Sequence, residues 1–304
     1  MKLEVNGRKK AIFVRDDVGE EQADSIVLDS VWEYDLHDRG NWTLTHRVQR
    51  KILTYNGKKD NAELSWDYNP AWEEVEVVRA SVTSAGTTKE ISAQEINLMD
   101  AGWVSSAPRY PAAKTLVASL PGVEEGSVID YEVKHTVKDR PFFAARQFFR
   151  GHDPMTRKTV RIRVPAGMKL RTRVYQGGVL APDAAEAIQE NVTTDGEGRT
   201  VYEWRVVDQP AVRREDGLPP WEAFMPVMFA TTGDWDDYAR DVRRTLKAAA
   251  KESATVESLA AEARAQAKDP AAAVQAIRDV VAKRIRYAGP ALDDLPLSAV
   301  STAD

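Results

Sequence analysis

The chain has 304 residues, enough for two domains and a substantial core. Hydrophobic residues make up 43% and charged residues 29%, which is ordinary for a globular protein. A net charge of -5 argues against a nucleic-acid partner, because such proteins present a clustered basic face. The sequence has no cysteine, which excludes disulfides, thiolate metal sites and a cysteine nucleophile from this chain.

Neither a membrane span nor a leader is expected. No apolar run approaches the roughly 20 residues that a transmembrane helix needs. Residues 1–7 contain no hydrophobic signal-peptide core, so we expect an export signal to be absent or removed.

Residues 25–52 alternate between apolar and polar side chains, as in strands with one buried face. The turn-forming residues 38–41 divide them into two strands, and Asn56-Gly57 is expected to close the pair with a second turn. The apolar positions of one parity are Ile26, Leu28, Trp32 and Tyr34, followed by Trp42, Leu44, His46, Val48 and Ile52. For His46, and for His135 in a later strand, this parity predicts a partly buried, hydrogen-bonded side chain.

Further short segments of the same kind follow, at residues 75–82, 129–137, 160–164, 170–174 and 202–206. Many short strands with one apolar face must stack two sheets to hide those faces. Residues 1–234 are therefore predicted to form a large antiparallel β-sandwich, with residues 211–234 as an irregular connector because prolines interrupt pairing. The basic cluster Arg157, Lys158, Arg161 and Arg163 is interpreted as the solvated face of one strand.

From Trp235 the sequence becomes alanine-rich and helical in period. Asp234, Thr255 and Asp269 are expected to cap three helices, the last beginning at Pro270. The third carries an apolar stripe of Val274, Ile277, Val281 and Ile285. Such a stripe needs a partner surface, and three short helices supply only part of one. Residues 235–304 are therefore expected to be the opening of a second domain, the remainder of which lies beyond this chain.

Residues 235–238, the helical segment up to Asp269-Pro270 and residues 280–287 resemble the start of bacterial transglutaminase-like domains. In that family a helix ends in an Ile-x-Tyr element, matched here by Ile285 and Tyr287. A Gly-x-Cys element with the nucleophile follows, and a His and an Asp complete a triad. Residues 292–304 occupy the approach to that cysteine, so no triad residue can be assigned in this chain.

The first 235 residues resemble the β-rich domain of unknown function that precedes such domains. The matching features are Arg39-Gly40, Tyr68-Asn69-Pro70, residues 121–126 and the segment from Phe148 to Pro154. The resemblance implies an exported bacterial protein, periplasmic or extracellular. Its catalytic domain would be a cysteine peptidase or acyltransferase acting on peptide or amide bonds, and it would be this chain's partner.

The residues themselves offer no catalytic, cofactor or metal site. The four histidines are scattered without metal-ligand spacing, and the glycine pairs lack the context of a phosphate loop. Aromatic residues in proline-rich loops are candidates for recognition, namely Trp103, Tyr110 and Trp221. The alternative, which the sequence favours, is that they plug the ends of the sandwich or the seam between the two regions.

Two functions remain open at this point. The chain is a non-catalytic region that positions or docks a catalytic domain, or it is a glycan- or peptide-binding sandwich with a helical stalk.

Overall fold

The computed structural model describes residues 2–5, 8–11, 23–102, 113–177, 187–212, 221, 225–250 and 253–284. For residues 2–11 only the backbone is described, and it forms the antiparallel pair β1 (Lys2–Val5) and β2 (Arg8–Ala11). Trp103, Tyr110, the Ile285–Tyr287 element and residues 292–304 lie outside the described residues.

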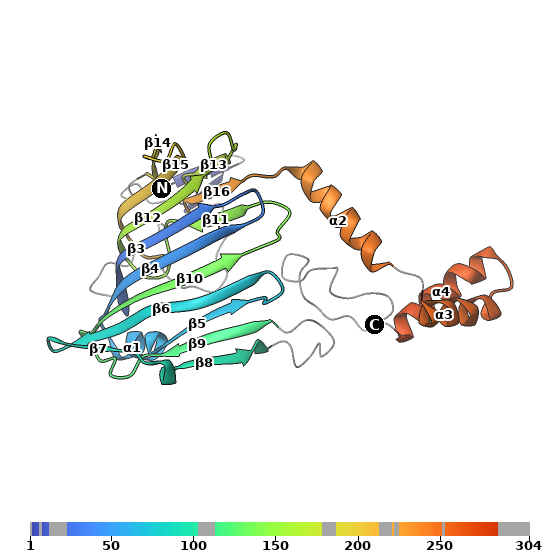
Figure 1. Cartoon of the computed structure of the whole chain (residues 1–304), viewed down its shortest axis with the longest axis horizontal. Coiled ribbons are helices and arrows are strands. Elements are labelled where there is room, and N and C mark those ends of the chain that lie inside the picture. The colour runs from blue at the N-terminus through green and yellow to red at the C-terminus, as the bar shows by residue number, and fades with distance from the viewer. Residues whose placement is uncertain are drawn as a thin grey trace. The chain divides into compact units, whose positions relative to one another are not determined.

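An eight-stranded sheet dominates the described structure (Figure 1). In spatial order its strands are β14 (Gln189–Thr194), β15 (Thr200–Gln209), β12 (Met155–Val164), β3 (Ser25–Leu36), β4 (Trp42–Ile52), β10 (Val128–Val137), β6 (Glu73–Ser84) and β7 (Thr87–Glu90). Neighbouring strands pair antiparallel except β3 and β12, which run parallel. A parallel pair needs a long connection, and these two strands are far apart in the sequence.

Two three-stranded sheets accompany the large one. The first contains β11 (Ala144–Phe148), β16 (Val227–Thr231) and β13 (Arg171–Tyr175) in that order. The second contains β5 (Glu63–Tyr68), β9 (Lys114–Ser119) and β8 (Ile96–Asp100), the last preceded by the 3₁₀ helix η2 (Ala93–Glu95). The mainly β architecture confirms the fold class that the sequence predicts.

The segment 211–234, expected to be an irregular connector, contributes a strand. β16 lies in the middle of its sheet and pairs antiparallel with both β11 and β13. The prolines of this segment come before β16 in the sequence, and the last of them, Pro226, immediately precedes its first residue. None of them therefore removes a hydrogen bond from the strand. Met228 and Ala230 alternate inward from β16 and are fully or almost fully buried.

The main core lies between the large sheet and the β11-β16-β13 sheet. Trp204, Val160 and Ile162 from the large sheet and Phe143 and Phe149 beside β11 are all inaccessible to solvent. At the other end of the large sheet a second cluster joins its strands to the segments around β5 and β9, through Ile52, Ala80, Val82 and Ile129 with Leu64, Leu120 and Val123. Both clusters bury the faces that the alternating pattern marks as apolar.

Asn56-Gly57 does not form the expected tight turn. It lies in the helix α1 (Tyr55–Asn61), whose first turn is capped by the Thr54 hydroxyl, which accepts from the Gly57 amide at 3.1 Å. A Cβ atom at position 57 would stand 2.0 Å from the carbonyl oxygen of Asp24. That carbonyl accepts hydrogen bonds from the amides of Leu53 and Thr54, so it is held in place.

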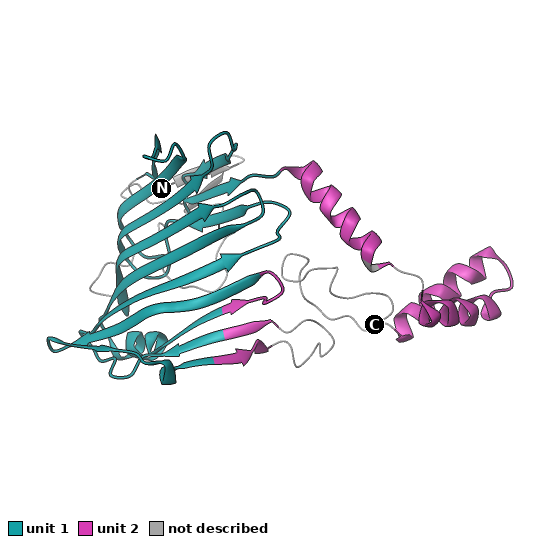
Figure 2. Ribbon diagram, in the orientation of Figure 1, with its two compact units in different colours: residues 1–66, 73–97, 116–233 teal, residues 67–72, 98–115, 234–304 magenta. Residues whose placement is uncertain are grey.

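The chain divides into two compact units, one of residues 1–66, 73–97 and 116–233 and one of residues 67–72, 98–115 and 234–304 (Figure 2). The second contains α2 (Trp235–Ala249), α3 (Ala254–Gln266) and α4 (Pro270–Arg284). Asp234 caps α2 as expected and forms a reciprocal capping box with Asp237. Ser253, two residues before the expected Thr255, caps α3. Among the described helices, none combines the length and hydrophobicity of a membrane span.

Gly57→Ala is expected to lower the free energy of unfolding by more than about 2 kcal/mol, because the new methyl group meets fixed backbone rather than a movable side chain. Urea denaturation followed by tryptophan fluorescence measures the change. Gly196→Ala is the matched control, since nothing lies within 4 Å of a Cβ atom there. Equal stability of the two variants would show that position 57 is not in close contact with the Asp24 carbonyl.

Candidate functional site

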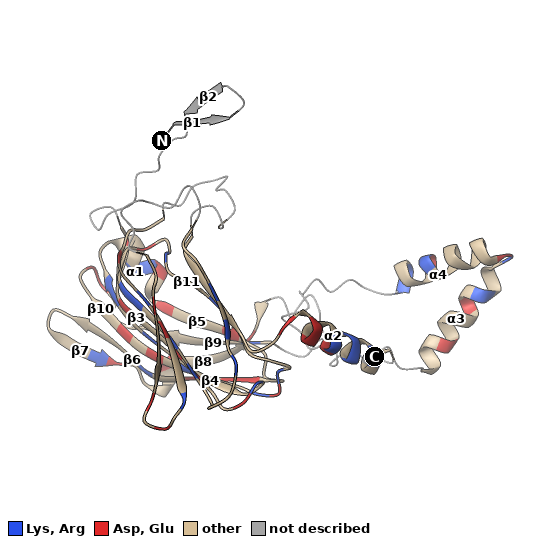
Figure 3. Ribbon diagram, turned by 90° about the horizontal axis from the view of Figure 1, so that it is seen from above, with Lys and Arg blue, Asp and Glu red and all other residues tan. Residues whose placement is uncertain are grey.

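Charged residues of both signs are distributed along the strands of the large sheet (Figure 3), and several of them form a network of ion pairs on its outward face. Glu33 on β3 lies at its centre and pairs with Arg47 on β4 at 3.1 Å and with Arg161 on β12 at 3.3 Å. The network continues outward on both sides, from Arg47 to Glu132 and Arg79 and from Arg161 to Glu203. These pairs are partly exposed, and ion pairs at a protein surface contribute little stability individually, so the main effect of the network is to keep this face polar.

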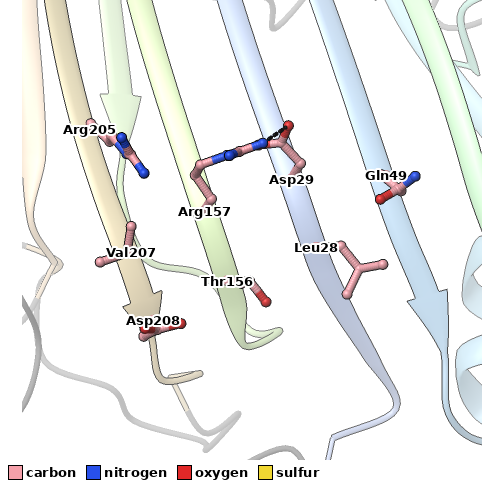
Figure 4. Close-up of a pocket in the computed structure, with 8 residues that line it drawn as sticks. All are labelled: Leu28, Asp29, Gln49, Thr156, Arg157, Arg205, Val207 and Asp208. Atoms are coloured by element: carbon pink, nitrogen blue, oxygen red, sulfur yellow. Dashed lines mark hydrogen bonds and ion pairs between the residues drawn. The ribbon is translucent and has the colours of Figure 1, made fainter.

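One open groove of about 360 Å³ interrupts this face (Figure 4). Its residues come from β3, β4, β12 and β15, and they are Leu28, Asp29, Gln49, Thr156, Arg157, Arg205, Val207 and Asp208. Arg157 donates two hydrogen bonds to the Asp29 carboxylate, from Nε to Oδ1 at 2.8 Å and from Nη2 to Oδ2 at 2.7 Å. The lining is therefore polar, with Leu28 and Val207 as its apolar members.

The groove lies beside backbone irregularities in β3 and at the end of β15. In a regular strand consecutive side chains point to opposite faces, yet Leu28 and Asp29, Thr156 and Arg157, and Val207 and Asp208 all line the same groove. A register shift between Val27 and Asp29 marks a bulge in β3, and Asp208 has a left-handed backbone with φ of 47°. Bulges and left-handed residues redirect side chains and are frequent beside binding sites.

The inward face of the same strands holds a buried lysine. Lys158 Nζ donates to the Gln147 side-chain oxygen at 2.8 Å and to the Phe148 carbonyl at 2.7 Å, and no carboxylate among the described residues pairs with it. The rings of Trp32 and Phe149 lie 5.3 and 5.5 Å from the same nitrogen. Burial lowers the pKa of Lys158 to about 7.

The interpretation of Lys158 as part of a solvated basic face was wrong. Arg157, Arg161 and Arg163 do face outward, but Lys158 shares the parity of Val160 and Ile162 and points into the core with them. The sequence does contain a signal for burial, because Lys158 is two residues before the apolar Val160 and therefore lies on the same side of the strand. It was missed because a lysine is so rarely buried without a charged partner.

Further polar groups surround this lysine without forming a catalytic arrangement. Gln147 donates to the Tyr34 hydroxyl at 2.8 Å, and burial raises the pKa of Tyr34 to about 12. His46, buried as predicted, stacks on Trp32 at 3.7 Å between ring centres, and burial lowers its pKa. Its Nε2 is 3.5 Å from the Ser30 hydroxyl, too far for an activated nucleophile.

His135 is half-buried and hydrogen-bonded, as the sequence predicted. Its Nδ1 lies 2.8 Å from a carboxylate oxygen of Glu73. The acid therefore contacts a different histidine from the one beside Ser30, so these four described residues do not form a hydrolytic triad. Within the described ranges no three potential ligands gather in a metal site, and the whole sequence lacks cysteine.

Of the predicted recognition residues, only Trp221 is among the residues described. It is half-buried, with its ring 5.5 Å from that of Phe148 in an edge-on contact and 6.0 Å from that of Phe229. These contacts attach the segment before β16 to the β11-β16-β13 sheet. This is the packing role that the sequence left open as an alternative to recognition.

The chain belongs to the family described as a domain of unknown function with solved structure (DUF3857), which matches residues 38–213. This agrees with the prediction of a β-rich domain of unknown function. No curated protein matches the chain.

Solved structures extend the comparison to the fold. A protein from Parabacteroides distasonis named "putative protease" is 18% identical, with a TM-score of 0.74 over 90% of this chain and 53% of its own. The present chain thus spans about half the length of that relative. An M1 zinc metallopeptidase from Deinococcus radiodurans gives a TM-score of 0.33 at 11% identity, over 67% of this chain and 42% of its own.

Lys158 makes the folding stability depend on pH. The unfolded chain binds this proton more tightly than the folded protein, so stability rises as the pH increases from about 7 toward the ordinary lysine value of 10.5. The gain between pH 7 and 9.5 is on the order of 3 kcal/mol for this group alone. Lys158→Met is expected to remove most of that rise.

The measurement is urea denaturation of both proteins at pH 7 and 9.5. Lys134→Met serves as the control, because Lys134 is exposed on β10 and should leave the pH dependence unchanged. The assignment fails if Lys158→Met keeps the full pH dependence of the original protein.

Proposed function

We propose that this chain is the non-catalytic, amino-terminal region of a bacterial transglutaminase-like protein and that it positions a catalytic domain formed by further polypeptide. The observation that carries the proposal is the apolar surface of the helices. In α4 the exposed fractions of Val274, Ile277 and Val281 are 70%, 55% and 46%. Hydrophobic side chains repeated along one helix face are typical of a surface that packs against a partner.

A neighbouring face of α4 is already used. Ala276 and Val280 pack against Ala263 and Leu259 of α3, and this small contact makes the helical hairpin. The stripe that the sequence marks as the packing face is therefore not the one that α3 covers. In α2, Trp235, Tyr238 and Leu246 are likewise exposed.

Two further points support an accessory role. The family match lies within the β-rich region, at residues 38–213, and the solved relative is about twice as long as the stretch that corresponds to this chain. Residues of this chain cannot supply the thiolate that transglutaminase-like chemistry needs. Under the proposal the catalytic domain acts on peptide or amide bonds, and the protein is exported to the periplasm or beyond.

The two faces of α4 can be separated by neighbouring substitutions. Val281→Asp should leave the helicity of the chain nearly unchanged, because the new carboxylate points to water. Val280→Asp should unfold the α3–α4 hairpin, because it buries an unpaired charge at a cost of about 3 kcal/mol. Circular dichroism and hydrogen exchange of α3 and α4 measure both effects. Equal damage from the two variants would mean that the stripe is already covered.

Reading the parent gene past codon 304 tests the enzymatic part directly. The proposal requires a Gly-x-Cys element shortly downstream and a His and an Asp beyond it. An open reading frame that continues without such a set refutes the transglutaminase-like assignment. It would leave the binding-module alternative standing.

A further inference from the structure

Arg205 differs from the other arginines of the large sheet. In the described strands of this sheet, the remaining arginines each form an ion pair with a carboxylate, namely Arg47, Arg50, Arg79, Arg157, Arg161 and Arg163. Arg205 is exposed on β15 and has no such partner among the described residues. Arg205 is thus the one arginine in the described strands of this sheet that is not paired with a carboxylate, and it lines the groove.

The groove offers this guanidinium together with neutral hydrogen-bonding groups. Gln49 and Thr156 line the same depression and can each donate or accept (Figure 4). Leu28 and Val207 provide apolar surface beside them. The bulge in β3 falls at Leu28 and the left-handed backbone at Asp208, so two of the residues that line the groove stand at backbone irregularities.

The charges of the lining define the ligand further. Arg157 is neutralised by its two hydrogen bonds to Asp29, and Asp208 adds a second negative charge to the same groove. A doubly charged phosphate would be repelled by both of these acids. The single charge of a carboxylate, in contrast, is balanced by Arg205. Guanidinium and carboxylate match in plane and spacing, which favours a two-point contact.

We propose that this groove binds a ligand bearing one carboxylate, which Arg205 holds while Gln49 and Thr156 contact neighbouring hydroxyl or amide groups. An acidic sugar and the carboxyl terminus of a peptide share this chemistry. The inference goes beyond the accessory role proposed above and does not depend on it, because it concerns the β-rich region alone.

The test titrates the complete chain with glucuronate, with N-acetylalanine and, as the uncharged analogue, with N-acetylalanine amide, followed by nuclear magnetic resonance of the amide and guanidinium groups. Binding is expected for at least one of the two carboxylates, with shifts in β12 and β15, and for the uncharged amide none. Glucuronate binding identifies the sugar source, and N-acetylalanine binding identifies the peptide source.

Arg205→Gln should weaken that binding about tenfold or more, since a hydrogen bond to a charged group contributes roughly 1.5–3 kcal/mol. Arg79→Gln is the matched control, being an exposed arginine on the same face whose partners are Asp130 and Glu132. Circular dichroism shows that both variants remain folded. Failure of both carboxylates to bind, or equal binding by Arg205→Gln and the original protein, overturns the proposal.

Discussion

The described structure depends on one constraint, which is that a wide sheet must bury one face and keep the other in water. The inward face packs Val160, Ile162 and Trp204 against the sheet that contains β16. The outward face carries a ladder of alternating charges centred on Glu33. Since side chains alternate along every strand, one register satisfies both faces at once, and a shift by one residue would exchange them.

Two places depart from this regular division. Lys158 brings a cation into the core, where neutral acceptors and two aromatic rings receive it in place of a carboxylate. On the other face, the bulge at Leu28 and the left-handed Asp208 lie in the lining of the groove. Departures of this kind lower stability, and natural proteins retain them mostly where function requires them. The groove is accessible to a ligand and the lysine is not, so we assign binding to the first and a pH-dependent stability to the second.

Much of the fold could be predicted because the alternating pattern is local. The strands from Ile26 to Ile52, the buried His46 and the capping of α2 by Asp234 all follow from residues that are near in sequence. The helix at Gly57 could not be predicted, since it depends on contact with the carbonyl of Asp24. Neither could β16, because its place between β11 and β13 is decided by distant partners.

The candidate site could not be predicted from the sequence either, because it too depends on residues that are distant in the chain. In the sequence Arg205 looks like one more outward-facing cation on an alternating strand, and it becomes exceptional only because the other arginines in the described strands of the large sheet form ion pairs. Conversely, Trp221 was conspicuous in the sequence, yet its ring is engaged by Phe148 and Phe229. Residue type alone does not separate a side chain that recognises a ligand from one that fixes a loop.

Native-state hydrogen exchange of the intact chain, read out by mass spectrometry of its peptides, tests most directly whether the large sheet is the stabilising unit. The amides of β3, β4 and β12 should exchange only through global unfolding, because their strands are paired on both sides and carry the main core. Those of α3 and α4 should open at a much lower free energy, since few side chains are buried between these helices. Protection of α3 and α4 equal to that of β12 would contradict the account, because the helices would then already be enclosed.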